Sequence, residues 1–222
     1  MFRSVIAVCA LLLSAMQAFA QSDFKVTLLG TASPQARTDR FGPSTLVEAG
    51  GQVLLFDAGR GVPIRMNQLK IPIGKIDVLF LTHFHSDHVS GIPDVWLSGW
   101  LGSPMGRRKT PFHVVGPTGA NNLMKNLEKA YALDISIREA DEKLPPQGVE
   151  IKIEEFAKDG VVFEKNRHGD LVNQEIDAGA VFDDVLIVAR VAGNYRRVAV
   201  VIDAIAVCGF YDVAVVNLES AS

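Results

Sequence analysis

Short apolar runs separated by turn residues divide the sequence up to residue 156 into predicted strands and helices. Apolar stretches bounded by Gly, Pro or Asp are typical of strands. They predict strands over 25–29, 44–49, 52–56, 77–81, 112–115 and 149–156. Helical spacing predicts helices over 62–69 and from Gly116-Pro117 to about Ala130, while Gly50-Gly51 marks a hairpin turn. Strands that alternate with helices indicate an α/β layered domain.

The pattern changes beyond Asn166. From Val181 to Val216 the chain consists mostly of Val, Ala, Ile and Asp, without Pro or Ser. Turn residues therefore do not divide this stretch cleanly. One interpretation is a divergent tail of three strands, over 181–191, 197–207 and 211–218.

The first twenty residues have the composition of a secretory signal peptide. Arg3 supplies a positive start, Val5 to Leu13 is an apolar run, and Ala18-Phe19-Ala20 fits a cleavage site before Gln21. We therefore expect residues 1–20 to be removed and the protein to be periplasmic or secreted, with no membrane span after cleavage. The alternative is an uncleaved anchor. After cleavage only Cys208 remains, which excludes an intramolecular disulfide.

Composition narrows the choice of partners. The chain has 222 residues, of which 48% are hydrophobic, and this is enough to bury the core of one domain. Its net charge of -3 gives no electrostatic reason to expect nucleic acid, so that partner is predicted to be absent. The basic cluster Arg107-Arg108-Lys109 is interpreted as solvated surface. Trp96 and Trp100, four residues apart, indicate one helix face, with a substrate-binding wall as the alternative.

The strongest chemical signal is Thr82-His83-Phe84-His85-Ser86-Asp87-His88, directly after an apolar strand. His83 and His85, two residues apart in extended backbone, can face one metal ion, and Asp87 and His88 can face a second ion after a turn. Imidazole and carboxylate ligands suit zinc. Two adjacent metals can generate hydroxide at neutral pH and polarise the bond that is cut. His113, in the strand 112–115, lies outside this pattern and is interpreted as a core or surface residue.

This motif resembles that of the metallo-β-lactamase superfamily, in its ribonuclease Z-like or arylsulfatase-like branch. The resemblance runs from Phe24 to about Asn166 and includes three further segments: Leu29-Gly30-Thr31, Leu55-Phe56-Asp57-Ala58-Gly59 and Gly91-Ile92-Pro93. It implies an αββα sandwich, of which only the amino-terminal half is complete, and two zinc ions per intact site. His83 and His85 would bind the first ion, and Asp87 and His88 the second, with Asp87 as the catalytic residue. Asp57 would lie behind the ligands and orient the loop, unless it only caps a turn.

The resemblance also implies ligands from Asp-His-Gly and Ser-Gly-Asp-Thr segments, which do not occur after Asn166. When the tail codons are read as their reverse complement, permitted codon choices give both segments in that order. We therefore interpret 21–166 as an incomplete metallo-β-lactamase domain and 167–222 as an atypical, antisense-encoded tail.

These features predict an exported, zinc-dependent hydrolase in which a metal-bound hydroxide attacks an ester, sulfate, phosphate or lactam. One alternative is a tRNA 3′-processing endonuclease of the ribonuclease Z type, which the predicted signal peptide opposes. A second alternative is an inactive remnant that lacks half of its metal ligands. The four residues of the HxHxDH motif carry the site in each enzyme reading.

Overall fold

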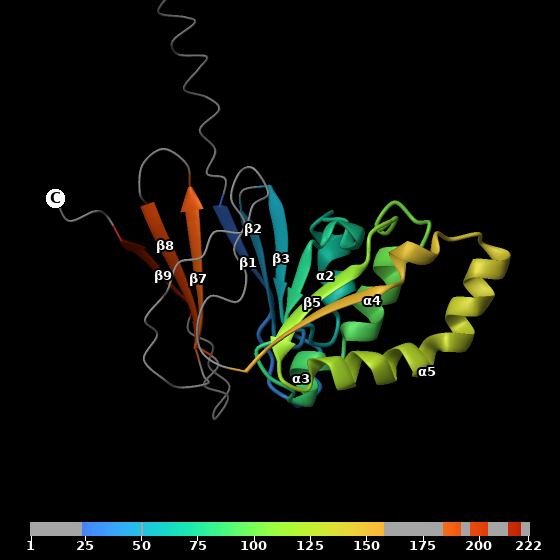
Figure 1. Cartoon of the computed structure of the whole chain (residues 1–222). Coiled ribbons are helices and arrows are strands. Elements are labelled where there is room, and N and C mark those ends of the chain that lie inside the picture. The colour runs from blue at the N-terminus through green and yellow to red at the C-terminus, as the bar shows by residue number, and fades with distance from the viewer. Residues whose placement is uncertain (1–23, 50, 158–183, 192–195, 204–212, 219–222) are drawn as a thin grey trace, which may run out of the picture.

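The computed structural model describes residues 24–49, 51–157, 184–191, 196–203 and 213–218. Six strands form one sheet in the order β1-β2-β3-β4-β5-β6 (Figure 1). Their bounds are β1 Phe24–Gly30, β2 Ser44–Ala49, β3 Gln52–Phe56, β4 Val78–Phe80, β5 Phe112–Pro117 and β6 Ile151–Phe156. The helical segments are α2 Val62–Gln68, η1 Ile73–Lys75, α3 Ser86–Val89, α4 Ile92–Trp100, α5 Ala120–Asp141 and η2 Pro146–Gly148. This mixture of sheet and helix confirms the predicted α/β class.

The sheet changes from antiparallel to parallel at β3. β1, β2 and β3 pair in antiparallel fashion, and the pairing of Ala49 with Gln52 closes the β2–β3 hairpin. Gly51 in this turn has a φ of 77°, which suits glycine. β3, β4, β5 and β6 are parallel neighbours. Parallel strands need crossover connections, and the helices supply them. The carboxyl ends of β3 and β4 consequently lie at the same edge of the sheet.

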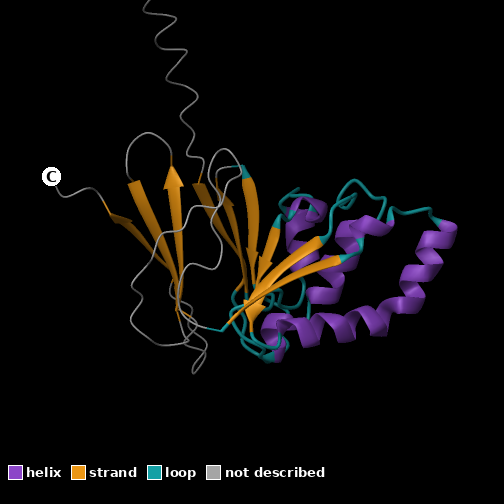
Figure 2. Ribbon diagram, viewed as in Figure 1, coloured by secondary structure: helices purple, strands orange, loops and turns teal. Residues whose placement is uncertain are grey.

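The main apolar core lies between the sheet and the helices α2, α4 and α5, which cover the same face (Figure 2). Trp96 and Trp100 of α4 are fully buried there. Their indole N–H groups donate to the carbonyls of Val149 and Pro145, at 2.9 and 2.8 Å. Buried indoles keep such partners because an unpaired N–H would be costly. The helix-face interpretation is confirmed, and the alternative of a substrate-binding wall is wrong.

The basic cluster is not a uniform solvated surface. Arg107 and Lys109 are exposed, but Arg108 is only 3% exposed. The Arg108 guanidinium donates to the carbonyls of Gly148 and Trp96 and lies 4.7 Å from the centre of the Phe112 ring. Burial lowers the pKa of Arg108 to about 10. The interpretation of Arg108 as a solvated surface residue is therefore wrong. Its segment packs against α4, and the composition of the neighbouring residues does not indicate this packing.

Helix α5 continues well past Ala130, where the sequence suggested its end, and stops at Asp141. No Gly or Pro interrupts the chain between Ala130 and Pro145. Arg138 also forms i,i+4 ion pairs with Asp134 and Glu142, which support the last turns. Within the ranges that the structure describes, no helix combines the length and hydrophobicity needed to span a membrane.

Three strands lie in the tail: β7 Asp184–Val191, β8 Arg196–Asp203 and β9 Val213–Leu218. They pair in antiparallel fashion in the order β7-β8-β9. Both interpretations of the tail expect strands here, because β-branched residues dominate the segment whatever its origin. The division at residue 166 stays a prediction. The predicted signal peptide, residues 1–20, lies outside the described residues and also stays a prediction.

The antisense interpretation makes a direct prediction about the gene. The strand complementary to the codons of residues 168–222 should encode an Asp-His-Gly segment followed by a Ser-Gly-Asp-Thr segment. Sequencing the genomic DNA across these codons provides the measurement. A complementary strand that encodes neither segment would show that the antisense interpretation is wrong and that the tail needs another explanation.

Candidate metal centre

Asp57, His83 and His88 come together because they follow neighbouring parallel strands. Asp57 is the residue after β3, and His83 lies three residues after the end of β4. Phe56 pairs with Phe80 across these strands, and the Asp57 N–H donates to the Phe80 carbonyl at 2.8 Å. The short helix α3 then returns His88 to the same edge. Strand pairing thus brings together residues that are more than twenty positions apart in the sequence.

Asp57 occupies the centre of a hydrogen-bond network. Its φ of 56° is unusual for a residue with a side chain. Oδ1 accepts from the Thr82 N–H at 2.9 Å, and Oδ2 accepts from the Thr82 hydroxyl at 2.7 Å. Oδ2 also lies 2.6 Å from Nδ1 of His88. The Ser44 hydroxyl donates to the Asp57 carbonyl at 2.8 Å. Four contacts therefore fix both the backbone and the carboxylate of Asp57.

This network decides which imidazole nitrogens are available for a metal. The Thr82 hydroxyl gives its proton to Asp57, so its oxygen accepts from Nδ1 of His83, 2.9 Å away. Nδ1 of His88 likewise donates to the Asp57 carboxylate. Both rings then carry their lone pair on Nε2. Fixing the tautomer through the other ring nitrogen is how proteins orient histidine ligands.

His85 and Asp87 complete the neighbourhood. Nδ1 of His85 lies 2.9 Å from Nε2 of His83, and the Asp87 carboxylate lies 3.8 Å from Nε2 of His88. Asp87 and His88 are buried, whereas His85 is exposed. Burial and the nearby His88 lower the pKa of His83. Its neutral form, which binds metals, therefore persists to a lower pH than in a free histidine.

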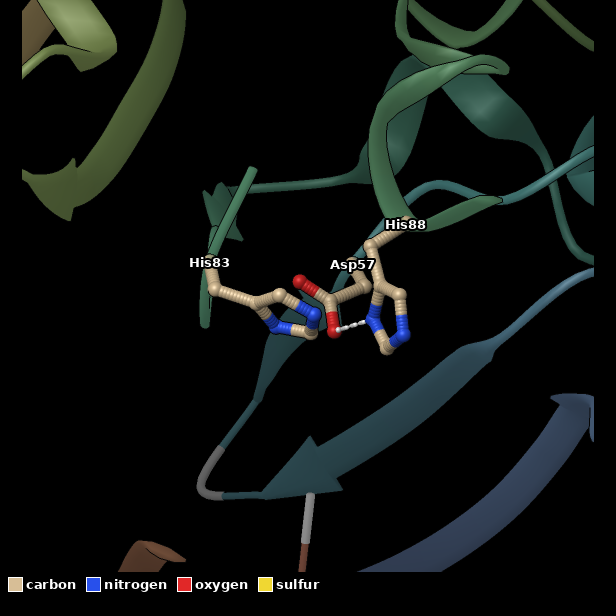
Figure 3. A group of neighbouring side chains, drawn as sticks. All are labelled: Asp57, His83 and His88. Atoms are coloured by element: carbon tan, nitrogen blue, oxygen red, sulfur yellow. Dashed lines mark hydrogen bonds and ion pairs between the residues drawn. The ribbon is translucent and has the colours of Figure 1, made fainter. Parts of the chain in front are cut away.

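The donor atoms fit a metal ion. One ligand atom from each of Asp57, His83 and His88 lies within 4.8 Å of the other two (Figure 3). Two imidazoles and a carboxylate are a donor set that zinc and related ions accept. The structure thus brings together His83, His85, Asp87, His88 and Asp57, all of which the sequence singled out. Their individual roles stay predictions.

Sequence reasoning assigned no role to Thr82 or Ser44, although both hold Asp57 in place. Thr82 could have been noticed as the hydroxyl residue before the first histidine, but Ser44 is separated from Asp57 by a whole hairpin. His113 lies in β5, 3.1 Å from Glu154, and is outside the group of metal-capable residues among the described part of the chain.

Three glycines let the backbone pack against the metal-ligand loop. A Cβ atom on Gly42 or Gly59 would lie 3.2 or 2.6 Å from the Asp87 carbonyl, and one on Gly91 would lie 2.2 Å from the Gly59 carbonyl. These contacts are between main-chain segments, which cannot rotate away as side chains do. Close packing of 31–43, 57–61 and 86–91 therefore holds Asp87 and His88 at the edge of the sheet.

Comparison with known proteins identifies relatives that share this part of the chain. The chain is 42% identical over 141 residues to Ribonuclease Z of Mycolicibacterium gilvum, and the match covers 63% of this chain and 48% of that protein. It is 39% identical over 145 residues to Ribonuclease Z of Mycobacterium marinum, covering 64% and 50%. The chain thus spans about half the length of the curated relatives it matches. The crystal structure of the short form of human tRNase Z has a TM-score of 0.47 at 22% identity, covering 60% of this chain and 45% of that one.

These relatives correct two predictions. The main functional prediction, an exported hydrolase of esters, sulfates, phosphates or lactams, is wrong, because the relatives are named Ribonuclease Z. Their name favours the alternative of a tRNA 3′-processing endonuclease. The prediction that nucleic acid is an improbable partner is wrong for the same reason. Net charge misled it, because charge summed over a whole chain does not report how charges are distributed over its surface.

The family itself follows from the domain match. A model described as "Metallo-beta-lactamase superfamily" matches residues 37–174, which is more than half of the chain and includes the whole HxHxDH motif. This agrees with the six-stranded sheet and with the convergence of Asp57, His83 and His88. The predicted enzyme class, a hydrolase, is confirmed by this match. The chain therefore belongs to the metallo-beta-lactamase superfamily.

Proposed function

We propose that this protein is a zinc-dependent endoribonuclease that processes the 3′ end of tRNA. Its curated relatives carry the name Ribonuclease Z at 42% and 39% identity. The observation that carries the proposal is the convergence of Asp57, His83 and His88 at one edge of the sheet. The imidazoles of His83, His85 and His88 with the Asp87 carboxylate favour zinc over calcium or magnesium, which prefer oxygen alone, and Asp57 lies where it can orient them.

Some residues of the site would bind the metal, and others would orient the metal ligands. His83, His85, Asp87 and His88 would hold the metal, and Asp57 would orient His88 directly and His83 through Thr82. Bound zinc lowers the pKa of water and polarises the phosphoryl oxygens of a substrate. The Asp87 carboxylate, which is buried, would accept the proton that an attacking water must lose. Burial around Asp57 and His88 keeps bulk water from competing for these contacts.

Arginines beside the site supply contacts for a phosphate backbone. Arg37 and Arg40 lie on the 31–43 loop, with Asp39 as its only acidic residue. The Gly42 N–H of that loop donates to the carbonyl of Arg60, whose turn follows Asp57. The backbones of the 31–43 loop and the 57–61 turn pack against the metal-ligand loop and carry three arginines. Arg37 and Arg40 pair with Asp39, and Arg60 donates to the Pro34 carbonyl. Guanidinium groups bind phosphates well, and such contacts dominate affinity for nucleic acids.

Cleavage of a precursor tRNA tests the proposal. The purified full chain, loaded with zinc, should release the 3′ trailer from a radiolabelled precursor tRNA. Removal of zinc with a chelator should stop the reaction, and added zinc should restore it. A 3′-extended hairpin RNA of the same length, without the tRNA fold, serves as the control substrate.

Two results would contradict the proposal. Hydrolysis of nitrophenyl esters or sulfates without RNA cleavage would place the substrate in another class. Loss of all hydrolysis, in a chain that is folded by circular dichroism, would support the remnant alternative. Replacement of His83 by alanine should abolish trailer release, which separates the reaction from that of a contaminating ribonuclease.

A further inference from the structure

Ser44 is a buried hydroxyl residue at the point where the pairing of β2 with β3 ends. The antiparallel register pairs Thr45 with Phe56, so the next opposed pair would be Ser44 and Asp57. Asp57 does not continue the strand, because its φ of 56° places its backbone in the left-handed region. The Ser44 hydroxyl instead donates to the Asp57 carbonyl at 2.8 Å, and Ser44 is only 4% exposed. A side-chain hydroxyl thus makes the contact where the backbone ladder stops.

The peptide group between Asp57 and Ala58 is held at both ends. Its carbonyl accepts from the Ser44 hydroxyl, and its N–H donates to the His88 carbonyl at 2.8 Å. The preceding N–H, that of Asp57, donates to the Phe80 carbonyl. A left-handed backbone is costly for a residue with a Cβ and persists only where surrounding contacts hold it. Of these three contacts, the hydrogen bond from Ser44 is the one that a side-chain substitution can remove.

The backbone conformation of Asp57 sets the direction of its carboxylate. In the left-handed conformation, the carboxylate reaches the N–H and hydroxyl of Thr82 and Nδ1 of His88. Relaxation of φ toward an ordinary value would turn the Cα–Cβ bond and carry the carboxylate away from these partners. His88 would then lose its contact directly, and His83 would lose the oriented Thr82 hydroxyl. Both imidazoles would no longer be held with their proton on Nδ1.

We propose that Ser44 is a positioning residue of the metal centre. Its hydroxyl holds the left-handed backbone of Asp57 and thereby keeps Nε2 of His83 and His88 unprotonated for a metal ion. The inference rests on the metal binding of the proposed function and is independent of RNA as the substrate. The alternative, that Ser44 only stabilises the end of the hairpin, predicts lower stability without a change in either imidazole.

NMR of the metal-free full chain tests the inference. Long-range proton–nitrogen correlation spectra, recorded in chelator on protein with labelled histidines, show which ring nitrogen carries the proton. In the wild type, His83 and His88 should be protonated on Nδ1. In the Ser44→Ala variant, both should shift toward protonation on Nε2, whereas His113, which contacts Glu154, should not change. Zinc affinity, measured by dye competition, should fall about tenfold because misoriented ligands bind more weakly.

Further variants separate the hydrogen bond from the volume of the side chain. Ser44→Cys keeps a side chain of similar size, but a thiol is a weak donor, so this variant should resemble Ser44→Ala. Ser44→Thr keeps the hydroxyl and should retain the wild-type tautomers and zinc affinity. Thr45→Val is the matched control, because Thr45 is also buried and its side chain points to the opposite face of β2. It should leave the tautomers and zinc affinity unchanged, whatever its effect on unfolding by urea.

The outcomes distinguish this inference from the proposed function. Wild-type tautomers of His83 and His88 in a folded Ser44→Ala variant would overturn the inference and leave the proposed function standing. If Ser44→Ala does not fold, the spectrum of Ser44→Cys decides in the same way. A wild-type chain that binds no zinc, but whose tautomers depend on Ser44, would overturn the proposed function and support the positioning role.

Discussion

Replacing His88 with alanine is expected to lower zinc affinity by at least about a hundredfold. Loss of a group that only orients a ligand already costs about 10–100-fold, so loss of a ligand itself should cost more. His88 is also 2% exposed, and its Nδ1 lies 2.6 Å from the Asp57 carboxylate. Among the described residues, its removal leaves the Asp57 carboxylate with its two hydrogen bonds from Thr82. The free energy of unfolding should therefore fall by about 2 kcal/mol without metal.

Competition with a zinc-binding dye measures the affinity, and urea unfolding in chelator measures stability. His113→Ala is the matched control, because this half-buried histidine contacts Glu154 in another part of the sheet. It should retain wild-type zinc affinity. Asp57→Asn should lie between the two, about 10–100-fold weaker than wild type. Unchanged zinc binding in the His88→Ala variant would mean that the metal centre lies elsewhere.

Replacing Gly59 with alanine is expected to be among the most destabilising single changes in the chain. The new Cβ would lie 2.5 Å from the Gly42 carbonyl carbon, 2.6 Å from the Asp87 oxygen and 2.7 Å from the Pro43 nitrogen. All three are backbone atoms, so relief requires two chain segments to move apart. Overpacking of a rigid core costs about 1–3 kcal/mol, and we expect about 3 kcal/mol or more here. Displacement of Asp87 should lower zinc affinity as well.

Gly102→Ala provides the matched control. A Cβ there would meet only the Cδ2 atom of Leu144, at 3.7 Å, which is an ordinary contact. Its stability should change by less than about 1 kcal/mol, or increase slightly through the unfolded chain. Urea unfolding compares the two variants. An unfolding midpoint of Gly59→Ala equal to that of Gly102→Ala would show that the 31–43 and 86–91 loops separate freely.

Several parts of the fold could be predicted because they depend on local pattern. β2 and β3 have the predicted bounds, since short apolar strands around a glycine turn carry their own signals. The end of α5 was placed too early, because a helix without Gly or Pro gives no stop signal until the residues before Pro145. Arg108 was assigned to the surface, because burial of a charged residue depends on carbonyls of Trp96 and Gly148 that are distant in sequence.

In the candidate site too, some features follow from neighbouring residues and others depend on residues distant in the sequence. The four residues of the HxHxDH motif lie within six positions of one another. The end of one strand and a single helical turn are enough to bring their side chains together, so the motif could be found from the sequence. The roles of Thr82 and Ser44 are different. Each acts through Asp57, which is 25 residues before Thr82 and 13 residues after Ser44. Sequence spacing does not encode such contacts, because they arise only when β2, β3 and β4 lie side by side.

The sequence by itself determined the α/β class and the HxHxDH residues, because periodicity and ligand spacing are properties of neighbouring residues. Its net charge led to the wrong partner, since a sum over 222 residues does not report the distribution of charge over the surface. Only the tertiary structure showed that Asp57 fixes the tautomers of two histidines and that Phe84 is exposed. It also showed that three loops pack closely because glycines without a Cβ lie at their contacts. Those features depend on long-range strand pairing and backbone packing, which place residues within hydrogen-bond distance regardless of their separation in the chain.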